Sequence, residues 1–286
     1  MVYRAWFRLV RGGDIVTKLE TMDRTFNKTD LEKSLSGCLL GNRIHFFDTI
    51  DSTNTYAAVL ATGGAREGEV VISDCQTAGK GRLRERVWHS PPGKNLYTSV
   101  IFRPCIPPAL APGLTLVAGV AVFDLLKGYC PVSLKWPNDI LAGGRKISGI
   151  LTEMRSRGSK VDFVVVGIGI NVNMEPGDFQ EDLRLRSTSL KEQTARHISR
   201  LELTAGLYRE LERWYRLFIE DGLAPVRDRW LECSDMVGKT VEVTNRGVVQ
   251  RGKCQGIDDE GMILFTDKKN RMISVRSGDV TIQKDR

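Results

Sequence analysis

Residues 76–104 read QTAGKGRLRERVWHSPPGKNLYTSVIFRP. The first part of this stretch sets Gly79 and Gly81 among four cationic side chains and a tryptophan. Glycine adopts positive φ readily and lets backbone N–H groups approach a ligand, and guanidinium groups match phosphate or carboxylate oxygens. Taken alone, such a loop is about as typical of a solvated surface or a nucleic-acid patch as it is of a specific anion-binding site. The stretch predicts an anion-binding loop, and its neighbours must identify the anion.

The chain around this loop predicts a mixture of strands and helices. Residues 70–72 form a buried strand that leads into the loop, and Leu96 to Phe102 alternate like a strand with two faces. The pair Gly143 and Gly144 predicts a two-residue hairpin turn. A short helix capped by Thr29 is expected before residue 37. Further strands are expected at 44–47, 132–136, 140–142, 146–153 and 162–167, and further helices at 54–61, 114–126 and 199–221.

The last fifty residues have a different pattern. After Asp235 the sequence alternates in five short segments at 240–244, 248–256, 261–266, 272–275 and 280–283, separated by turn residues. Five short strands in so few residues predict a small antiparallel barrel. At the other end, residues 1–40 are polar and weakly periodic, so we expect an extension there and not the paired helices of a helix-turn-helix.

Composition narrows the class of protein. A chain of 286 residues with 41% hydrophobic and 27% charged residues is typical of a globular protein with a main domain and a smaller one. The net charge of +7 would attract nucleic acid, acidic membrane or acidic protein without selecting among them. Six cysteines and three histidines show no metal-binding spacing, which indicates reduced thiols and no metal site. We expect a cytoplasmic protein, because the N-terminus lacks a secretory signal and the apolar stretch from Leu110 to Leu126 is interrupted.

Four more motifs surround the basic loop: DSTN at 51–54, KWPND at 135–139, RKISGIL at 145–151 and GIGINVN at 167–173. In this order and spacing they resemble the biotin protein ligases, which attach biotin to the carrier subunit of acetyl-CoA carboxylase. The resemblance covers roughly residues 43–286. It implies an enzyme that joins biotin to ATP-derived AMP, forming biotinyl-5'-AMP, and then passes the biotinyl group to a lysine of the biotin carboxyl carrier protein.

The resemblance also implies a fold and a domain plan. The expected class is α+β, with a mixed β-sheet catalytic domain flanked by helices, as in class II synthetases and biotin ligases. This domain would span residues 41–235, after an N-terminal extension at 1–40. Residues 236–286 would form the small barrel, which in the family is an SH3-like domain.

Site residues are carried over position by position from the family motifs. The catalytic positions are Lys135 and Arg82. The positions that match biotin contacts are Ser52, Thr53, Asn54, Gln76, Lys80, Gly81, Arg82, Lys135 and Gly149. Those that match nucleotide contacts are Gly79, Arg82, Trp88, Asn138 and Asn171. Lys80 replaces an arginine that is usual in the family, and the loop is one residue longer before Trp88. No metal cage is readable, although ATP chemistry normally brings Mg²⁺ held partly by phosphates.

Each of these residues also has a purely structural interpretation. Lys135 could be a solvated lysine at a strand end, and the Ser-Thr-Asn sequence at 52–54 is a good helix cap. Trp88 and Asn171 could serve packing or a turn, and Gly149 could mark a bulge. Ligand binding and helix capping are compatible at 52–54. The loop has few apolar residues, so we expect it to be ordered by ligand.

Other functions remain open at this level. The GIG at 167–169 fails the dinucleotide fingerprint because Val172 stands where a third glycine is required, and GKT at 238–240 fails the P-loop because Cys233 replaces its first glycine. Some relatives also carry a DNA-binding winged helix and act as biotin-responsive repressors, and a related fold transfers lipoate or octanoate. We expect no DNA binding and no membrane association, and the family suggests a homodimer.

Overall fold

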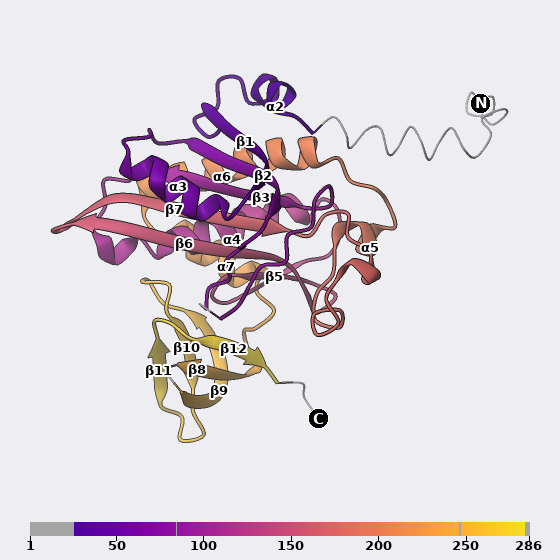
Figure 1. Cartoon of the computed structure of the whole chain (residues 1–286). Coiled ribbons are helices and arrows are strands. Elements are labelled where there is room, and N and C mark those ends of the chain that lie inside the picture. Colours follow the sequence, from indigo (N-terminus) through magenta and orange to yellow (C-terminus); the bar gives the residue numbers. More distant parts are fainter. Residues whose placement is uncertain (1–25, 84, 246, 284–286) are drawn as a thin grey trace, which may run out of the picture.

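A computed structural model describes residues 26–83, 85–245 and 247–283 of the chain (Figure 1). Its larger part is a seven-stranded sheet with the order β1-β2-β3-β7-β6-β5-β4, in which only β1 and β2 run parallel. The predicted α+β class with a mixed sheet is therefore confirmed. The strands are β1 (Arg43–Ile50), β2 (Glu69–Gln76), β3 (Leu96–Phe102), β4 (Ser133–Lys135), β5 (Asp139–Ala142), β6 (Arg145–Arg157) and β7 (Lys160–Ile170). The helices are α2 (Lys28–Ser34), α3 (Thr53–Thr62), α4 (Gly113–Leu126), α5 (Leu190–Thr194), α6 (Arg200–Asp221) and α7 (Ala224–Cys233), with short 3₁₀ turns η1 (Pro108–Leu110) and η2 (Pro176–Asp178).

Helices cover the two faces of the sheet unequally. Val71 and Ile101 pack with Ala57 of α3, whereas Val70 and Val100, one residue away, pack in a separate cluster with α4, α6 and α7. Because side chains alternate along a strand, α3 lies on one face and the other three helices lie on the opposite face, as Figure 1 shows. All seven residues of β3 are buried, since both of its faces are covered.

The helix α4 is apolar on all sides and contacts β4 to β7, α6 and α7. A helix with this composition is stable where it is surrounded by protein. Within the part of the chain that the structure describes, Pro108–Leu126 is long and apolar enough to cross a membrane, yet 61% of its apolar window is buried inside the protein. This is the burial of a core helix.

The described part of the predicted N-terminal extension packs on the main core. The helix α2 contacts α6 and β1, and Leu31, Leu35 and Leu40 are buried. Its N-cap is Asn27, whose side chain accepts a hydrogen bond from the backbone N–H of Asp30 at 3.0 Å. The expected cap at Thr29 was wrong by two residues, because Asn27 supplies an equally good oxygen earlier in the chain. Residues 1–25 of the extension lie outside the described residues.

A second sheet follows α7 in the chain. It has the order β11-β10-β9-β8-β12 and is antiparallel throughout, in agreement with the predicted SH3-like barrel. Its strands are β8 (Thr240–Asn245), β9 (Val248–Ile257), β10 (Ile263–Thr266), β11 (Met272–Val275) and β12 (Asp279–Ile282), and we call residues 236–283 the C-terminal barrel. The change from one sheet to the other falls between Cys233 and Thr240, so the division near residue 235 is compatible with the topology and stays a prediction.

Trp136 of the KWPND segment joins the barrel to the main sheet. Its indole N–H donates to the carbonyl of Gly261 at 3.0 Å, and its backbone N–H donates to the sulfur of Met236 at 3.2 Å. The side chain is only 2% exposed. The short strand that carries Lys135 is thus supported from the barrel side.

Local signals in the sequence agree with several boundaries. Gly143 and Gly144 take φ of 56° and 74° in the turn between β5 and β6, a conformation that glycine adopts without strain. Ser199 caps α6 by accepting from the N–H of Glu202 at 3.3 Å. The helix α7 was not predicted. Its Pro225 stands in the first turn, where proline is tolerated and does not break a helix.

Candidate active site

One cross-strand row of the main sheet forms the floor of the site. Directly paired residues of neighbouring strands place their side chains on the same face. The row runs from Tyr97 on β3 through Gly169 on β7, Gly149 on β6 and Asp139 on β5 to Lys135 on β4. Its two central positions are glycines, so the floor there is bare backbone. The row lies on the face covered farther along the sheet by α3.

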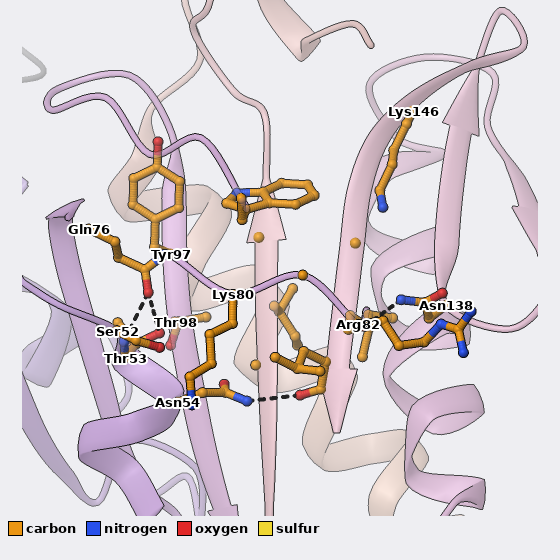
Figure 2. A pocket seen from close by; sticks show the side chains of 18 residues that line it. Ser52, Thr53, Asn54, Gln76, Lys80, Arg82, Tyr97, Thr98, Asn138 and Lys146 are labelled. Atoms are coloured by element: carbon orange, nitrogen blue, oxygen red, sulfur yellow. Dashed lines mark hydrogen bonds between the residues drawn. The ribbon is translucent and has the colours of Figure 1, made fainter. Parts of the chain in front are cut away.

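A cleft with about 470 Å³ of open space lies over this floor (Figure 2). Its walls come from the first turn of α3, the basic loop (residues 79–87 apart from residue 84) and strands β3, β6 and β7. The predicted site residues that line it are Ser52, Thr53, Asn54, Gln76, Lys80, Gly81, Arg82, Trp88, Asn138 and Gly149. Segments far apart in the sequence therefore converge on one cavity.

Three predicted residues do not line this cleft. Gly79 lies beside it, and its backbone carbonyl accepts from the N–H of Trp88 at 2.9 Å. Asn171 is 6% exposed and donates to the carbonyl of Thr188 at 2.9 Å, which is the structural role considered for it. Lys135 lies at the end of the floor row, with its ammonium 3.6 Å from a carboxylate oxygen of Asp139.

The start of α3 presents polar groups to the cleft. Ser52 caps the helix, accepting from the N–H of Thr55 at 3.4 Å, and it also lines the cavity. The backbone N–H and hydroxyl of Thr53 both donate to the side-chain oxygen of Gln76, at 2.9 and 3.1 Å. The Gln76 amide nitrogen donates to the hydroxyl of Ser90 at 3.0 Å. The 52–54 segment thus both caps a helix and lines the cleft.

Asn54 fixes the first turn of α3 against the sheet. Its amide nitrogen donates to the carbonyl of Leu151 at 3.2 Å and to the carboxylate of Glu153 at 2.9 Å, and its oxygen accepts from Ser99 at 2.6 Å. The side chain fits because it faces Gly167, where a Cβ would lie 2.8 Å from Asn54 Cγ and still closer to its oxygen. The residue is 4% exposed, so every polar atom of its amide needs these partners.

The basic loop folds back on itself and reaches the C-terminal barrel. The N–H of Gly81 donates to the carbonyl of Arg86 at 2.8 Å. The guanidinium of Arg82 donates to the carbonyl of Gly278 at 3.0 Å and pairs with Asp279, and Arg86 contacts the other oxygen of that carboxylate at 2.9 Å. One barrel carboxylate therefore holds two arginines of the loop. Figure 2 shows Arg82 beside Asn138 at the edge of the cleft.

Trp88 lies flat over the glycine floor. A Cβ on Gly169 would be 2.6 Å from its Cε2 atom, and a Cβ on Gly149 would be 2.8 Å from its Cζ3 atom. Its indole nitrogen is buried and has no hydrogen-bond partner among the described residues. The ring is therefore placed by the two glycines, and its N–H is available to an acceptor on a ligand.

Lys146 is a cleft cation that the sequence analysis did not single out. Its side chain points into the cavity in Figure 2, and its ammonium lies 5.2 Å from the centre of the Trp88 ring. It stands in the RKISGIL motif, which was the available signal. The floor glycines Gly167 and Gly169 were likewise in a quoted motif, GIGINVN, but only as a rejected dinucleotide fingerprint.

Tyr97 closes the end of the floor row opposite Lys135. Burial raises the pKa of its phenol well above the usual range, so the hydroxyl stays protonated and donates to the carbonyl of Pro91 at 3.1 Å. At neutral pH the Tyr97 side chain is therefore an uncharged part of the cleft wall. Among the described residues, no group of three or more histidine, cysteine, aspartate or glutamate side chains is placed to hold a metal ion.

Comparison with known proteins agrees with this geometry. Residues 46–171 match the model of the Biotin/lipoate A/B protein ligase family. The chain is 37% identical over 241 residues to the bifunctional ligase/repressor BirA of Bacillus subtilis, covering 84% of this chain and 74% of that protein. It is 32% identical over 228 residues to the biotin–[acetyl-CoA-carboxylase] ligase of Paracoccus denitrificans, covering 78% of this chain and 94% of the relative.

A solved structure shares the fold over nearly the whole described chain. The biotin protein ligase of Aquifex aeolicus, in complex with biotin and ATP, superposes with a TM-score of 0.74 at 27% identity, covering 85% of this chain and all of that one. The motifs, the fold and the extent of these matches agree, and the chain belongs to the Biotin/lipoate A/B protein ligase family, among its biotin protein ligases.

Proposed function

We propose that this chain activates biotin with ATP to biotinyl-5'-AMP and transfers the biotinyl group to one lysine of the biotin carboxyl carrier protein of acetyl-CoA carboxylase. The observation that carries the proposal is the single cleft in which the family motifs meet over a glycine floor. The Aquifex relative binds biotin and ATP on the same fold, and the Paracoccus relative is named for the acetyl-CoA carboxylase reaction. We infer that ATP and biotin are the small substrates here, and that Mg²⁺ arrives with the ATP phosphates.

The reaction has two group-transfer steps. In the first, a carboxylate oxygen of biotin bonds to the α-phosphorus of ATP, and the bond from that phosphorus to the bridging oxygen breaks to release pyrophosphate. In the second, the lysine amine of the carrier bonds to the acyl carbon, and AMP leaves with its phosphate oxygen while the amine loses a proton. Both steps concentrate negative charge at one point, so fixed cations are the chief catalytic device. We assign this role to Lys135 and Arg82.

The polar wall at the start of α3 suits the ring of biotin. A ureido group offers a carbonyl acceptor and two N–H donors, which hydroxyl and amide side chains can pair without a net charge. Ser52, Thr53 and Gln76 supply such groups and already hold one another in place. Lys80, Gly81 and Gly149 line the same cavity. We assign these residues and Asn54 to biotin, and Trp88 and Asn138, which also line the cleft, to the nucleotide. The nucleotide contacts expected for Gly79 and Asn171, which lie outside the lining, stay predictions.

We propose a ligase without a DNA-binding function, although BirA of Bacillus subtilis is named as both ligase and repressor. Between residues 26 and 42 the described chain contains one seven-residue helix, α2, which is packed on α6. The ligase of Paracoccus denitrificans is matched over 94% of its length. Fluorescence anisotropy with a labelled duplex at low salt tests this point, and saturable, salt-sensitive binding would favour the bifunctional alternative.

We also place the enzyme in the cytoplasm and suggest that it forms a homodimer. The six cysteines are all free, as expected for a reducing compartment. Sedimentation of the purified chain over a range of concentrations tests the dimer.

The deciding experiment is mass spectrometry of a carrier domain after incubation with the enzyme, biotin, ATP and Mg²⁺. We expect the mass of one biotinyl group on a single lysine, and none on a carrier in which that lysine is arginine. A parallel incubation with lipoate in place of biotin separates the related transferases. Transfer of lipoate without transfer of biotin would contradict the proposal.

A further inference from the structure

A series of hydrogen bonds runs beside the cleft from Thr53 through Gln76 and Ser90 to Trp88, and we call these four residues the Ser90 network. The hydroxyl of Thr53 donates to the side-chain oxygen of Gln76 at 3.1 Å, and the Gln76 amide nitrogen donates to the hydroxyl of Ser90 at 3.0 Å. That hydroxyl donates in turn to the backbone carbonyl of Trp88 at 2.9 Å. Because Thr53 and Gln76 are assigned to biotin and Trp88 to the nucleotide, the network joins the two parts of the cleft.

The hydrogen bonds of Thr53 determine the direction of the whole network. Its backbone N–H also donates to the Gln76 oxygen, at 2.9 Å, so two donors identify that end of the amide as the acceptor. The other end is the NH₂ group, which uses one hydrogen for Ser90 and has one left for a ligand in the cleft. Since Ser90 accepts from Gln76, its own hydrogen is directed to Trp88.

Ser90 is placed to act on its neighbours and not on a ligand. The residue is 5% exposed and is not among those that line the cleft, whereas Gln76 and Trp88 both line it. A Cβ on Gly79 would lie 2.9 Å from the Ser90 hydroxyl oxygen, so the backbone of the basic loop covers this hydroxyl closely. Water has little access there, and removing the hydroxyl would leave the Gln76 amide and the Trp88 carbonyl without a replacement partner.

The backbone path after Trp88 is held by contacts that do not involve this hydroxyl. The phenol of Tyr97 donates to the carbonyl of Pro91 at 3.1 Å. The backbone N–H of Gly93 donates to the carboxylate of Asp74 at 2.9 Å. Removing the hydroxyl should therefore affect the groups that it bonds and leave the course of the segment unchanged.

We propose that Ser90 is a positioning residue of this enzyme, whose hydroxyl orients the Gln76 amide for biotin and the Trp88 backbone for the nucleotide at the same time. A ligand that fixes one end of the network also fixes the other, so the second ligand binds to a site that is already ordered. This inference rests on the proposed function, since it concerns the biotin and ATP assigned to the same cleft.

The test measures the coupling between the two ligands by calorimetry. Biotin and α,β-methylene-ATP, whose bridging carbon blocks adenylate formation, are each titrated into the whole chain with Mg²⁺, alone and after saturation with the other ligand. We expect biotin to tighten binding of the analogue by at least about 5-fold in the parent chain, and the analogue to tighten biotin binding by the same factor. In Ser90→Ala this coupling factor should fall below about 2-fold, and each ligand alone should bind about 3- to 10-fold more weakly.

A merely structural role for Ser90 would give a different pattern. Ser73→Ala is the matched control, because Ser73 is 1% exposed on β2 and its hydroxyl donates to the carbonyl of Cys75, outside the Ser90 network. It should lower the midpoint of thermal unfolding about as much as Ser90→Ala does, while the coupling factor stays that of the parent chain. Ser90→Cys keeps a weak donor and should show intermediate coupling, and it replaces Ser90→Ala in the comparison if the alanine variant does not fold.

The Trp88 carbonyl can also be observed directly. Trp88 and His89 form the one Trp-His pair in the sequence, so a chain labelled with carbonyl-¹³C tryptophan and ¹⁵N histidine gives a single signal from that peptide bond. We expect Ser90→Ala to shift this carbonyl resonance and Ser73→Ala to leave it in place, because the first substitution alone removes a hydrogen bond to the carbonyl.

Two failures can be told apart. A parent chain that fails to bind biotin or the ATP analogue removes the proposed function and this inference together. A parent chain that binds both, without coupling or with the same coupling in Ser90→Ala, overturns this inference alone.

Discussion

Substituting Gly167 by alanine should destabilise the protein and close the biotin wall of the cleft. A Cβ at this position would lie 2.8 Å from Asn54 Cγ and 3.2 Å from its amide nitrogen. Asn54 cannot turn away freely, because three hydrogen bonds hold it to Leu151, Glu153 and Ser99. Either the Asn54 side chain leaves its partners or the first turn of α3 moves off the sheet.

The magnitude follows from these two routes. Losing three buried hydrogen bonds costs about 3 kcal/mol at a net 1 kcal/mol each. Forcing an extra carbon into a packed site costs about 1–3 kcal/mol by itself. The smaller of the two costs sets the result, so we expect the free energy of unfolding to fall by about 1–3 kcal/mol. Biotin binding should weaken as well, since both routes displace Thr53 or Asn54.

The assay is urea denaturation followed by circular dichroism, with biotin affinity measured by calorimetry. Gly177→Ala is the matched control, because a Cβ there has nothing within 4 Å, and it should change stability by less than about 0.5 kcal/mol. The double variant Gly167→Ala, Asn54→Ala should be more stable than the two single effects predict, since removing Asn54 removes the clash. Additive effects, or a Gly167→Ala chain as stable as the control, would refute the reasoning.

Three other predictions test the charged groups. Lys135→Ala should leave the fold intact and slow adenylate formation by about 100- to 1000-fold, which single-turnover kinetics measures; a near-normal rate would exclude the role proposed for it. Asp279→Asn should release Arg82 and speed hydrogen exchange in residues 79–83 at least several-fold. The exposed control Asp182→Asn should leave the exchange rates unchanged. Unchanged exchange in Asp279→Asn would show that the Arg82–Asp279 ion pair does not order the loop. Burial alone would raise the pKa of Asp124, but hydrogen bonds from an arginine, a lysine and an indole lower it to about 2. The contribution of this carboxylate to the free energy of unfolding is therefore present above pH 4 and is lost as the pH falls toward 2. Asp124→Asn should lower the free energy of unfolding by about 2 kcal/mol at pH 7 and reduce the loss of stability between pH 4 and pH 2 in denaturation experiments. An unchanged loss of stability in this range would contradict the role given to Asp124.

Much of the fold was predictable because its signals are local. The strand Leu96–Phe102 was predicted with its observed ends, and the glycines at 143 and 144 made the expected turn. The caps at Ser52 and Ser199 work through oxygens that reach N–H groups three residues away. Such features depend on few neighbours, so sequence suffices for them.

The arrangement of the site was harder to predict, because strand pairing between distant segments creates it. The residue types in RKISGIL did not reveal that a bulge at Ile147 turns Lys146 into the cleft. The floor depends on the pairing of Gly149 with Gly169, which lie twenty residues apart and on different strands. The contact of Arg82 with Asp279 spans 197 residues and needs both domains in place. The family resemblance named most of the residues that line the cleft but not these contacts.

The support that the barrel gives to Trp136 and Arg82 bears on how relatives of this enzyme can be recombined. A chimaera that takes its last fifty residues from another species would lose the matched barrel contacts of both segments. Residues 79–87 and 135–139 would therefore have to be taken from the same species as the barrel. Substitutions in the barrel are thus expected to be accompanied by substitutions in these two upstream segments. Libraries for engineering new acyl specificity should vary the barrel and the two segments together.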